Sequence, residues 1–238
     1  MKVIINESQL KEVILLEYQE RMLFESFLSS KNLEDLKMKI KKALVGGVAV
    51  ISVLAAIHDL NIRKSEKEYL ENIVKMEVEQ LHKADSVFNE KVEACKKYME
   101  WALSNQGYSF KSTDLRPETL VKAAEESGFD LPFLIAVAHQ ESCFGATPRA
   151  KKTNSVFSVG SYDDGSNVVN YSDPNESVID YINLIKRDYM INGKTINDLM
   201  IPNNFVNKNG DRYAQDKKYE NKIKYLRDLI IKNFPELR

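Results

Sequence analysis

The chain has 238 residues, of which 43% are apolar and 29% are charged. This length is sufficient for one large domain or two small ones, each with its own hydrophobic core. The 34 basic and 35 acidic side chains give a net charge of −1, so the charge does not favour nucleic acid as a partner. With only 9 Gly and 6 Pro, the composition also excludes a low-complexity chain.

The first 105 residues contain no proline and, apart from Gly46 and Gly47, no glycine. Their content of Leu, Glu and Lys predicts a module that is nearly all helix. From Leu70 to Ala102 the apolar residues recur at helical spacing, which predicts one long amphipathic helix over about 66–104. Its apolar stripe is expected to pack on a partner in the same chain or in another subunit. We place the domain boundary after this helix, between a helical module over 1–105 and a second domain over 106–238.

An uncharged segment over 43–57 lies inside the helical module. As a helix it reaches roughly 22–24 Å, which is shorter than the ~30 Å hydrocarbon core of a bilayer. One interpretation is a weak membrane contact, with the preceding lysines between Lys37 and Lys42 on the cytoplasmic side. The other is a helix buried on all sides within the module. The length favours the second interpretation, and both stay open at this stage.

Two cysteines, Cys95 and Cys143, show neither metal-ligand spacing nor a disulfide framework, so we expect two ordinary buried thiols. The chain has three histidines and no cluster of ligand residues, and we therefore predict no metal and no cofactor. The N-terminal residues lack the basic and apolar regions of a signal peptide, because Lys11 and Glu12 interrupt the first apolar run.

Proline and glycine divide the second part of the chain into short elements. They predict a helix over Pro117–Ser127 that stops at Gly128, and a helix over Leu131–Ser142 that Asp130 caps and Gly145 closes. Short strands over Val156–Tyr162 and Asn167–Tyr171 would form a β-hairpin. We further expect a helix that begins at Asp173, with Glu176 completing a capping box, and a last helix over about 217–233. The predicted fold class is mainly α, of the α+β type, with one small β-hairpin.

Glu141 is the first candidate for chemistry. It lies on the same helix face as Leu134, Val137 and Ala138, so its carboxyl is expected near the core. Burial and the helix C-terminus both favour the neutral carboxyl and raise its pKa. A general acid at neutral pH requires such a shift. The alternative is a structural Glu that pairs with Arg149, Lys151 or Lys152, or that reaches the surface.

Four segments resemble motifs of the bacterial peptidoglycan glucosaminidases and of the related lysozyme-like lytic transglycosylases. The segment from His139 to Gly145 resembles their helix end E-S-x-[FW]-G. Val156-Phe-Ser-Val159 is similar to their strand motif x-F-G-[IV]. Tyr171–Tyr181 is similar to a segment that begins Y-S and ends D-Y, and Gly210–Ala214 with Tyr219 is similar to G-x-Y-A…Y. The resemblance covers about residues 110–235, and nothing in residues 1–105 belongs to it.

The resemblance implies a lysozyme-like fold, in which a cleft between a helical body and a hairpin lobe holds a glycan strand. It makes Glu141 the acid that protonates the leaving glycosidic oxygen. It places Tyr213 at the cleft, where it supports catalysis or substrate binding. On the hairpin side, Tyr162, Tyr171, Asp163 and Asp164 would contact the substrate, whereas we expect the aromatic ring of Phe157 to be plain core.

The chain departs from the family pattern at two serines and at the second carboxylate. Ser155 stands where the family usually has Asn, and Ser158 replaces a Gly. Asp163, Asp164 and Glu176 are the nearest candidates for a second carboxylate, but turn and capping roles explain them equally well. Glycoside hydrolysis normally uses two carboxyls. The resemblance implies that a lytic transglycosylase needs one, because the 6-hydroxyl of muramic acid attacks. The substrate class is therefore predicted more firmly than the bond.

The leading hypothesis is an enzyme that cleaves peptidoglycan glycan strands and carries a helical delivery module. The module would contact a second copy or a virion partner through helix 66–104, or a membrane through 43–57. By analogy, this pairing suits a phage lysin or virion-associated protein that acts at the cell envelope or in the periplasm. The alternative is a non-catalytic murein-binding assembly protein with a degenerate lysozyme-like domain. A third possibility is a helical protein that remodels membranes.

Overall fold

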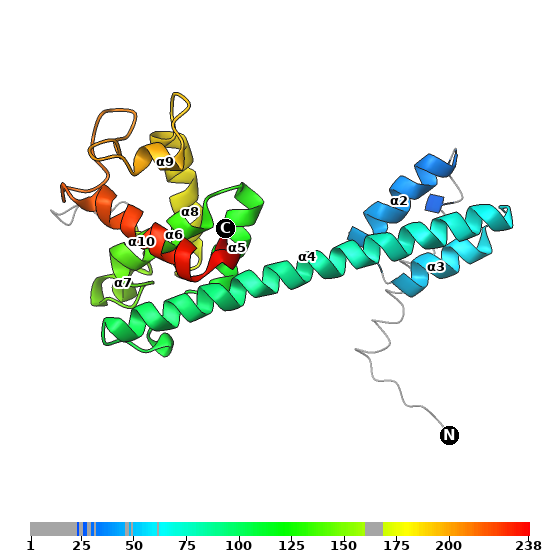
Figure 1. The fold of residues 1–238 in the computed structure, drawn as a ribbon, viewed down its shortest axis with the longest axis horizontal. Coiled ribbons are helices and arrows are strands. Elements are labelled where there is room, and N and C mark those ends of the chain that lie inside the picture. The colour runs from blue at the N-terminus through cyan, green and yellow to red at the C-terminus, as the bar shows by residue number, and fades with distance from the viewer. Residues whose placement is uncertain are drawn as a thin grey trace, which may run out of the picture. The chain divides into compact units, whose positions relative to one another are not determined.

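The computed structural model describes residues 23, 26–27, 30, 32–45, 48, 50–60, 62–159 and 169–238. The chain divides into two compact units, Met1–Val87 and Phe88–Arg238, and each has a hydrophobic core of its own. The described residues are mainly helical, as Figure 1 shows, and this confirms the predicted fold class.

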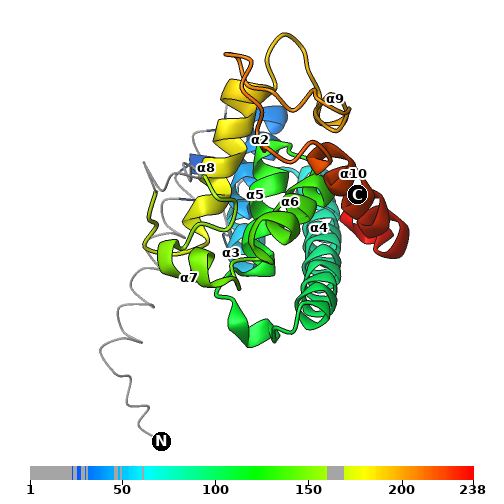
Figure 2. The same cartoon turned by 90° about the vertical axis from the view of Figure 1, so that its left-hand side faces the viewer.

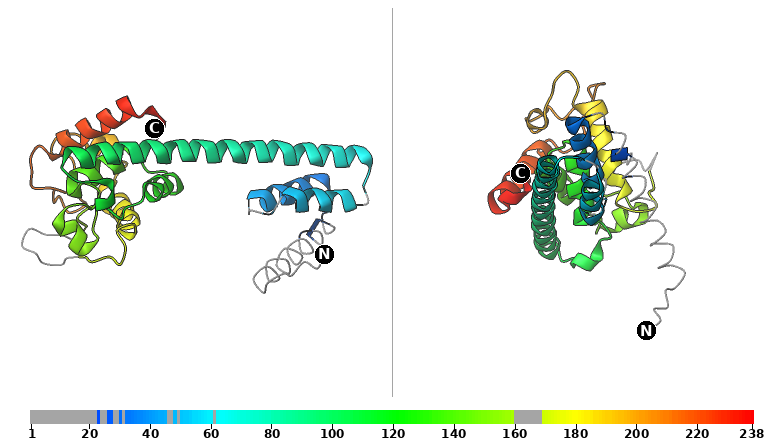
Figure 3. Two further views of the ribbon diagram at one scale, coloured as in Figure 1. Left: turned by 90° about the horizontal axis from the view of Figure 1, so that it is seen from below. Right: turned by 90° about the vertical axis from the view of Figure 1, so that its right-hand side faces the viewer.

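The first unit contains α2 (Leu33–Val45), α3 (Val50–Asp59) and the beginning of α4 (Lys64–Asn105). Apolar residues four positions apart on α2, such as Leu36, Ile40 and Leu44, face the core. They meet Val53, Ala56 and Ile57 of α3 and Leu70 and Val74 of α4, as the side-by-side helices in Figure 3 illustrate.

The segment over 43–57 is not one helix buried on all sides, which corrects that interpretation, whereas a membrane contact through this segment stays a prediction. Helix α2 ends at Val45 and α3 begins at Val50. Helix α3 buries one face only, because Val53 and Ile57 are fully buried while Leu54 is exposed. Within the described residues no helix is both long enough and apolar enough to cross a membrane.

Helix α4 confirms the predicted long helix and its end at Asn105. Its apolar stripe is shared by two cores. Leu70 and Val74 belong to the core of the first unit, and Val92–Leu103 contributes to that of the second, whereas Ala84 between them is exposed. The division between the compact units therefore falls within the helix, after Val87, and not at its end. The separate roles assigned to 1–105 and 106–238 stay predictions.

The second unit is built around α6 (Leu131–Ser142), which packs mainly on α5 (Pro117–Ser127) and α10 (Tyr219–Asn233), as seen in Figure 2. The bounds of α5 and α6 are those predicted. Every residue of α6 from Leu131 to Ala138 is buried. The Asp130 carboxylate accepts from Phe133 N at 2.8 Å and takes two hydrogen bonds from Arg227, at 3.0 and 2.6 Å. The cap of α6 is thereby tied to α10.

Shorter helical segments surround α6. They are α7 (Pro148–Thr153), α8 (Glu176–Leu184), α9 (Ile196–Leu199), a π-helical turn over Ile185–Tyr189, and 3-10 turns over Phe110–Ser112 and Pro235–Leu237. Helix α8 begins later than predicted, with Asn175 and not Asp173 preceding its first residue. The Glu176 carboxylate accepts hydrogen bonds from the backbone N and the hydroxyl of Ser172, at 3.2 and 2.7 Å. It therefore does not form the predicted capping box with Asp173.

The predicted β-hairpin does not form in the residues that the structure describes. Residues 156–159 form a turn in which Val156 and Phe157 are buried, and 169–171 are not a strand. Side chains form the hydrogen bonds of the Val156 backbone. Val156 N donates to Ser177 Oγ at 3.2 Å, and Ser142 Oγ donates to Val156 O at 2.6 Å. The rest of the expected hairpin, 160–168, lies outside the described residues. Elsewhere in the described chain, strand pairing is limited to the bridge between Val206 and Arg212.

Candidate active site

Glu141 occupies the last turn of α6, directly after the buried stretch of that helix. The left-handed backbone of Cys143, Phe144 and Gly145 ends the helix there and turns the chain away. The carboxyl is half-buried, and its Oε1 accepts a hydrogen bond of 2.5 Å from the Tyr219 hydroxyl at the start of α10. The packing of α6 on α10 therefore sets the position of the carboxyl.

Aromatic rings form the wall around this carboxyl. Tyr213 stacks on Phe205 with the ring centroids 4.5 Å apart, and it contacts the rings of Tyr219 and Tyr181 at 5.5 and 6.2 Å. Tyr181 in turn stacks on Phe157 at 4.3 Å. Phe157 is fully buried, which confirms that its ring belongs to the core. The acidic group is thus surrounded by side chains that offer little solvation.

Ser158 donates a side-chain hydrogen bond to Glu141 from the turn over 156–159. Its backbone is left-handed, with a φ of 54°, a conformation that Gly adopts without strain and Ser adopts at a cost. At this position the chain has Ser where the motif that the segment resembles has Gly. It adds a hydroxyl that contacts the carboxyl of Glu141.

The pKa of Glu141 is raised above the ordinary value of a glutamic acid, and burial is the main cause. Three groups act in the opposite direction. The hydrogen bonds from Tyr219 and Ser158 and the charge of Arg149 all favour the ionised carboxylate and lower the pKa. Burial outweighs these three effects, so the carboxyl keeps its proton to a higher pH than an exposed Glu does.

A groove of about 810 Å³ opens at Glu141 and Ser158. One wall comes from the end of α8 and the π-helical turn, and the other comes from the loop over 207–216. Its remaining lining residues are Val159, Leu184, Arg187, Asp188, Tyr189, Asn207, Asn209, Asp211, Arg212, Tyr213, Ala214, Gln215 and Asp216. Polar and aromatic groups dominate this list, and the volume is in the range of ligand pockets.

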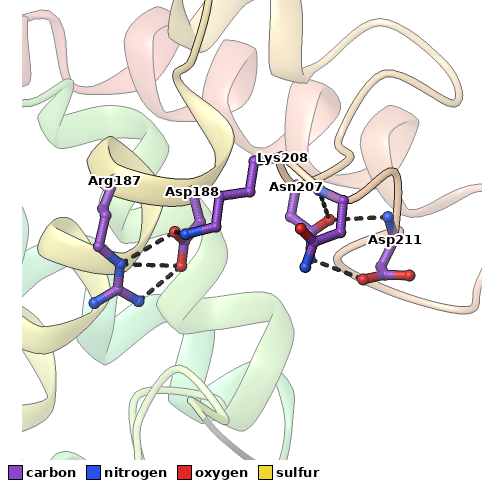
Figure 4. Close-up of polar contacts among 6 residues, drawn as sticks. Arg187, Asp188, Asn207, Lys208 and Asp211 are labelled. Carbon is purple, nitrogen blue, oxygen red and sulfur yellow. Dashed lines mark hydrogen bonds and ion pairs between the residues drawn. The ribbon is translucent and has the colours of Figure 1, made fainter.

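Asp188 lies on the rim of the groove, where Figure 4 shows it between two cations. Its carboxylate accepts from Arg187 at 2.7 Å and from Lys208 at 2.9 Å. These two partners, Arg187 first, hold the pKa of Asp188 well below its usual range. The ion pair with Lys208 joins the π-helical turn to the loop that forms the opposite wall. Because both oxygens are engaged with cations, Asp188 is poorly suited to act as a base.

The groove loop has its own anchors. Asn207 binds the backbone N and the carboxylate of Asp211, at 2.9 and 3.1 Å, as also drawn in Figure 4. Arg212 donates two bonds of 2.8 Å to Glu220 on α10, and Glu220 is only 1% exposed. The Tyr213 hydroxyl donates to Phe157 O at 3.0 Å. These bonds fix Tyr213 at the groove.

The other residues predicted as substrate contacts lie elsewhere or outside the described chain. The Tyr171 hydroxyl donates to Asp180 on α8 at 2.9 Å, and Tyr171 does not line the groove. Glu176 is engaged with Ser172. Tyr162, Asp163 and Asp164 lie outside the described residues. Their substrate-binding roles stay predictions, and so do the catalytic roles of Glu141 and Tyr213.

Sequence reasoning missed the contacts that tertiary packing creates. It noted Tyr219 only as part of a motif, whereas the Tyr219 hydroxyl is the direct partner of Glu141. It assigned no role to Tyr181, whose ring stacks on Phe157. The sequence shows Ser158 as a departure from the motif and gives no sign that it donates to Glu141. The π-helical turn over Ile185–Tyr189 has no sequence signal, although such turns are frequent at functional sites.

The arrangement is suited to proton donation into a groove. A carboxyl that burial keeps neutral can protonate a leaving oxygen, and the adjacent tyrosines hold it in place. Among the described residues no group of three or more His, Cys, Asp or Glu side chains could hold a metal ion. The half-buried carboxyl of Glu141 and the tyrosines beside it can support acid–base catalysis.

Comparison with known proteins identifies the second part of the chain. Residues 117–230 match the family model Glucosaminidase, described as mannosyl-glycoprotein endo-beta-N-acetylglucosaminidase. This is somewhat less than half of the chain. Comparisons with curated proteins and with solved structures gave no match. The family match supports glycosidase activity on peptidoglycan in general. Residues 117–230, which contribute Glu141, Tyr213 and Tyr219, are therefore similar to the glucosaminidase family.

Proposed function

We propose that the second unit cleaves the glycan strands of peptidoglycan, with Glu141 as the general acid. The observation that carries this proposal is a half-buried carboxyl with a raised pKa at a groove of about 810 Å³, within the segment that matches the glucosaminidase family. General acid catalysis by a positioned side chain contributes typically about 10²–10⁴-fold to a rate.

In this proposal Glu141 donates its proton to the glycosidic oxygen as the bond to the anomeric carbon breaks. Tyr219 holds the carboxyl through a hydrogen bond to Oε1, and Ser158 donates to the same carboxyl. Tyr213 lines the groove beside it and contacts the sugar. After the bond breaks, the Glu141 carboxylate serves as the base for the attacking hydroxyl, which belongs either to water or to the 6-position of the sugar itself.

The helical first unit delivers the domain to its substrate in this proposal. Two observations support this role of the first unit. The unit has a hydrophobic core of its own, and the residues of α4 over 82–87, between the two cores, are exposed. The partner is a second copy or a virion component bound through helix 66–104, or a membrane contacted through 43–57, and the cell envelope is the place of action. A phage lysin or virion-associated enzyme combines these two functions.

Digestion of purified murein by the full-length protein tests the proposal. We expect soluble muropeptides whose masses identify the new ends as reducing muramyl, reducing glucosaminyl or 1,6-anhydro ends. Sedimentation with murein and no new ends of any kind would instead support the non-catalytic murein-binding protein. If the protein neither binds murein nor cleaves it, both the enzymatic and the non-catalytic proposal are contradicted.

A further inference from the structure

A small polar recess adjoins the proposed acid and shares Glu141 and Ser158 with the groove. Its volume is about 30 Å³, and one water molecule requires roughly 10–15 Å³ of such space with several polar partners. The recess is therefore large enough for water and too small for a sugar ring. The other polar residues that line it are Ser142, Thr147, Arg149, Thr153 and Ser155.

Ser155 provides an unsatisfied hydroxyl in this recess. The residue is 4% exposed, and its Oγ has no hydrogen-bond partner among the described residues. Two neighbouring hydroxyls are already engaged: Ser142 Oγ donates to Val156 O at 2.6 Å, and Thr153 Oγ1 donates to Arg149 O at 3.1 Å. Buried hydroxyls are almost always hydrogen-bonded, and ordered water is the usual partner where protein supplies none.

The two serines that depart from the family motif come together at this point. Ser155 stands at the usual position of Asn and Ser158 at that of Gly, and both line the recess beside Glu141. Ser158 also bonds the carboxyl directly. The recess is thus formed in part by the features that distinguish this chain from the motif.

We infer that the recess holds one water molecule, bound by the Ser155 hydroxyl and the Glu141 carboxyl, and that this water is the nucleophile that completes the cleavage. The inference rests on the proposed function of Glu141. It goes further because it assigns hydrolysis, and not intramolecular attack, as the outcome. Ser155 is then a positioning residue for the water.

The chemistry proceeds in two steps. First the bond between the anomeric carbon and the leaving oxygen breaks, the proton of Glu141 moves to that oxygen, and the acetamido oxygen of the sugar bonds the anomeric carbon, as in substrate-assisted glycosidases. Then the oxygen of the water bonds the anomeric carbon and the bond to the acetamido oxygen breaks. The proton of the water returns to the Glu141 carboxylate. Because water enters from the side of Glu141, the anomeric configuration is retained.

The test compares the full-length protein with Ser155→Ala on purified murein. We expect the rate at which reducing ends form to fall about tenfold at saturating substrate, which is the effect of one lost hydrogen bond, with KM unchanged. The fraction of 1,6-anhydro ends should rise, because the 6-hydroxyl competes for the same anomeric carbon. Ser127→Ala is the matched control: it removes a hydroxyl that donates to Ala123 O on α5, and Ser127 lines neither the groove nor the recess.

A crystal structure of the parent protein gives an independent readout that does not depend on the variant. Ordered water within hydrogen-bond distance of both Ser155 Oγ and Glu141 is expected. An empty recess, an inverted anomeric product, 1,6-anhydro ends alone, or a Ser155→Ala variant with parental rate and products would each overturn the inference. Any of these results combined with an inactive Glu141→Gln variant leaves the proposed acid in place. Parental activity in Glu141→Gln overturns the proposed acid itself.

Discussion

At the scale of single residues, opposing effects set the protonation of Glu141. Burial raises its pKa, while the hydrogen bonds from Tyr219 and Ser158 and the charge of Arg149 lower it. The sequence indicated the first effect, because a carboxyl at the end of an apolar stripe is expected in the core. The opposing groups come from α10, the turn over 156–159 and α7, and the tertiary fold brings them together. Local sequence patterns do not predict that these groups lie close to Glu141.

Removal of one of the groups that lower the pKa of Glu141 should shift the pH dependence of activity to higher pH. In Tyr219→Phe the hydrogen bond that favours the carboxylate is lost, so the pKa of Glu141 rises further. A general acid works while it is protonated, and the alkaline limb of the kcat/KM profile should therefore move to higher pH. Tyr225→Phe is the matched control, because Tyr225 lies on the same helix and is 66% exposed. An unchanged limb, or one that moves to lower pH, would contradict the role of Tyr219.

At the scale of elements, those with local start and stop signals were predicted correctly. Helices α5 and α6 have the predicted bounds because Pro117, Asp130 and Gly128 determine their ends within a few residues. The hairpin prediction over 156–159 is wrong, because Ser142 and Ser177 bind that backbone from distant parts of the chain. Alternation of apolar residues indicates a strand only where a neighbouring strand is available.

The loop that carries Tyr213 depends on one buried ion pair between elements. Arg212 and Glu220 form two hydrogen bonds, and Arg212→Leu leaves the Glu220 carboxylate buried without its cation. We expect a loss of about 3–5 kcal/mol in the free energy of unfolding of the second unit, measured with denaturant. The double variant Arg212→Leu/Glu220→Leu should recover most of this loss.

An exposed ion pair serves as the control for that measurement. Lys122 and Glu126 on α5 are both more than half exposed, and Lys122→Leu should cost at most about 1 kcal/mol. Equal losses from Arg212→Leu and Lys122→Leu would show that burial of Glu220 is not what makes the first pair important.

At the scale of the whole molecule, two cores share one sequence stripe. The periodicity from Leu70 to Ala102 predicted helix α4, but a single stripe gives no indication of where one core stops and the next begins. The exposed residues over 82–87 mark that change in the structure. Independent cores of this kind are expected to unfold as separate cooperative units.

Calorimetry of the full-length protein should therefore resolve two transitions. Ile40→Ala removes a fully buried side chain from the core of the first unit and should lower the Tm of one transition only, at a cost of about 2–5 kcal/mol. Arg212→Leu should lower only the other. One transition that both substitutions shift equally would contradict two separate units.

The rate of murein cleavage by Glu141→Gln tests the proposed function most directly. Gln keeps the shape of the side chain and can still accept from the Tyr219 hydroxyl, but it has no proton to donate to the glycosidic oxygen. We expect the release of new glycan ends to fall at least about 100-fold while murein binding and both unfolding transitions are preserved. Cleavage at the parental rate would show that another group is the acid.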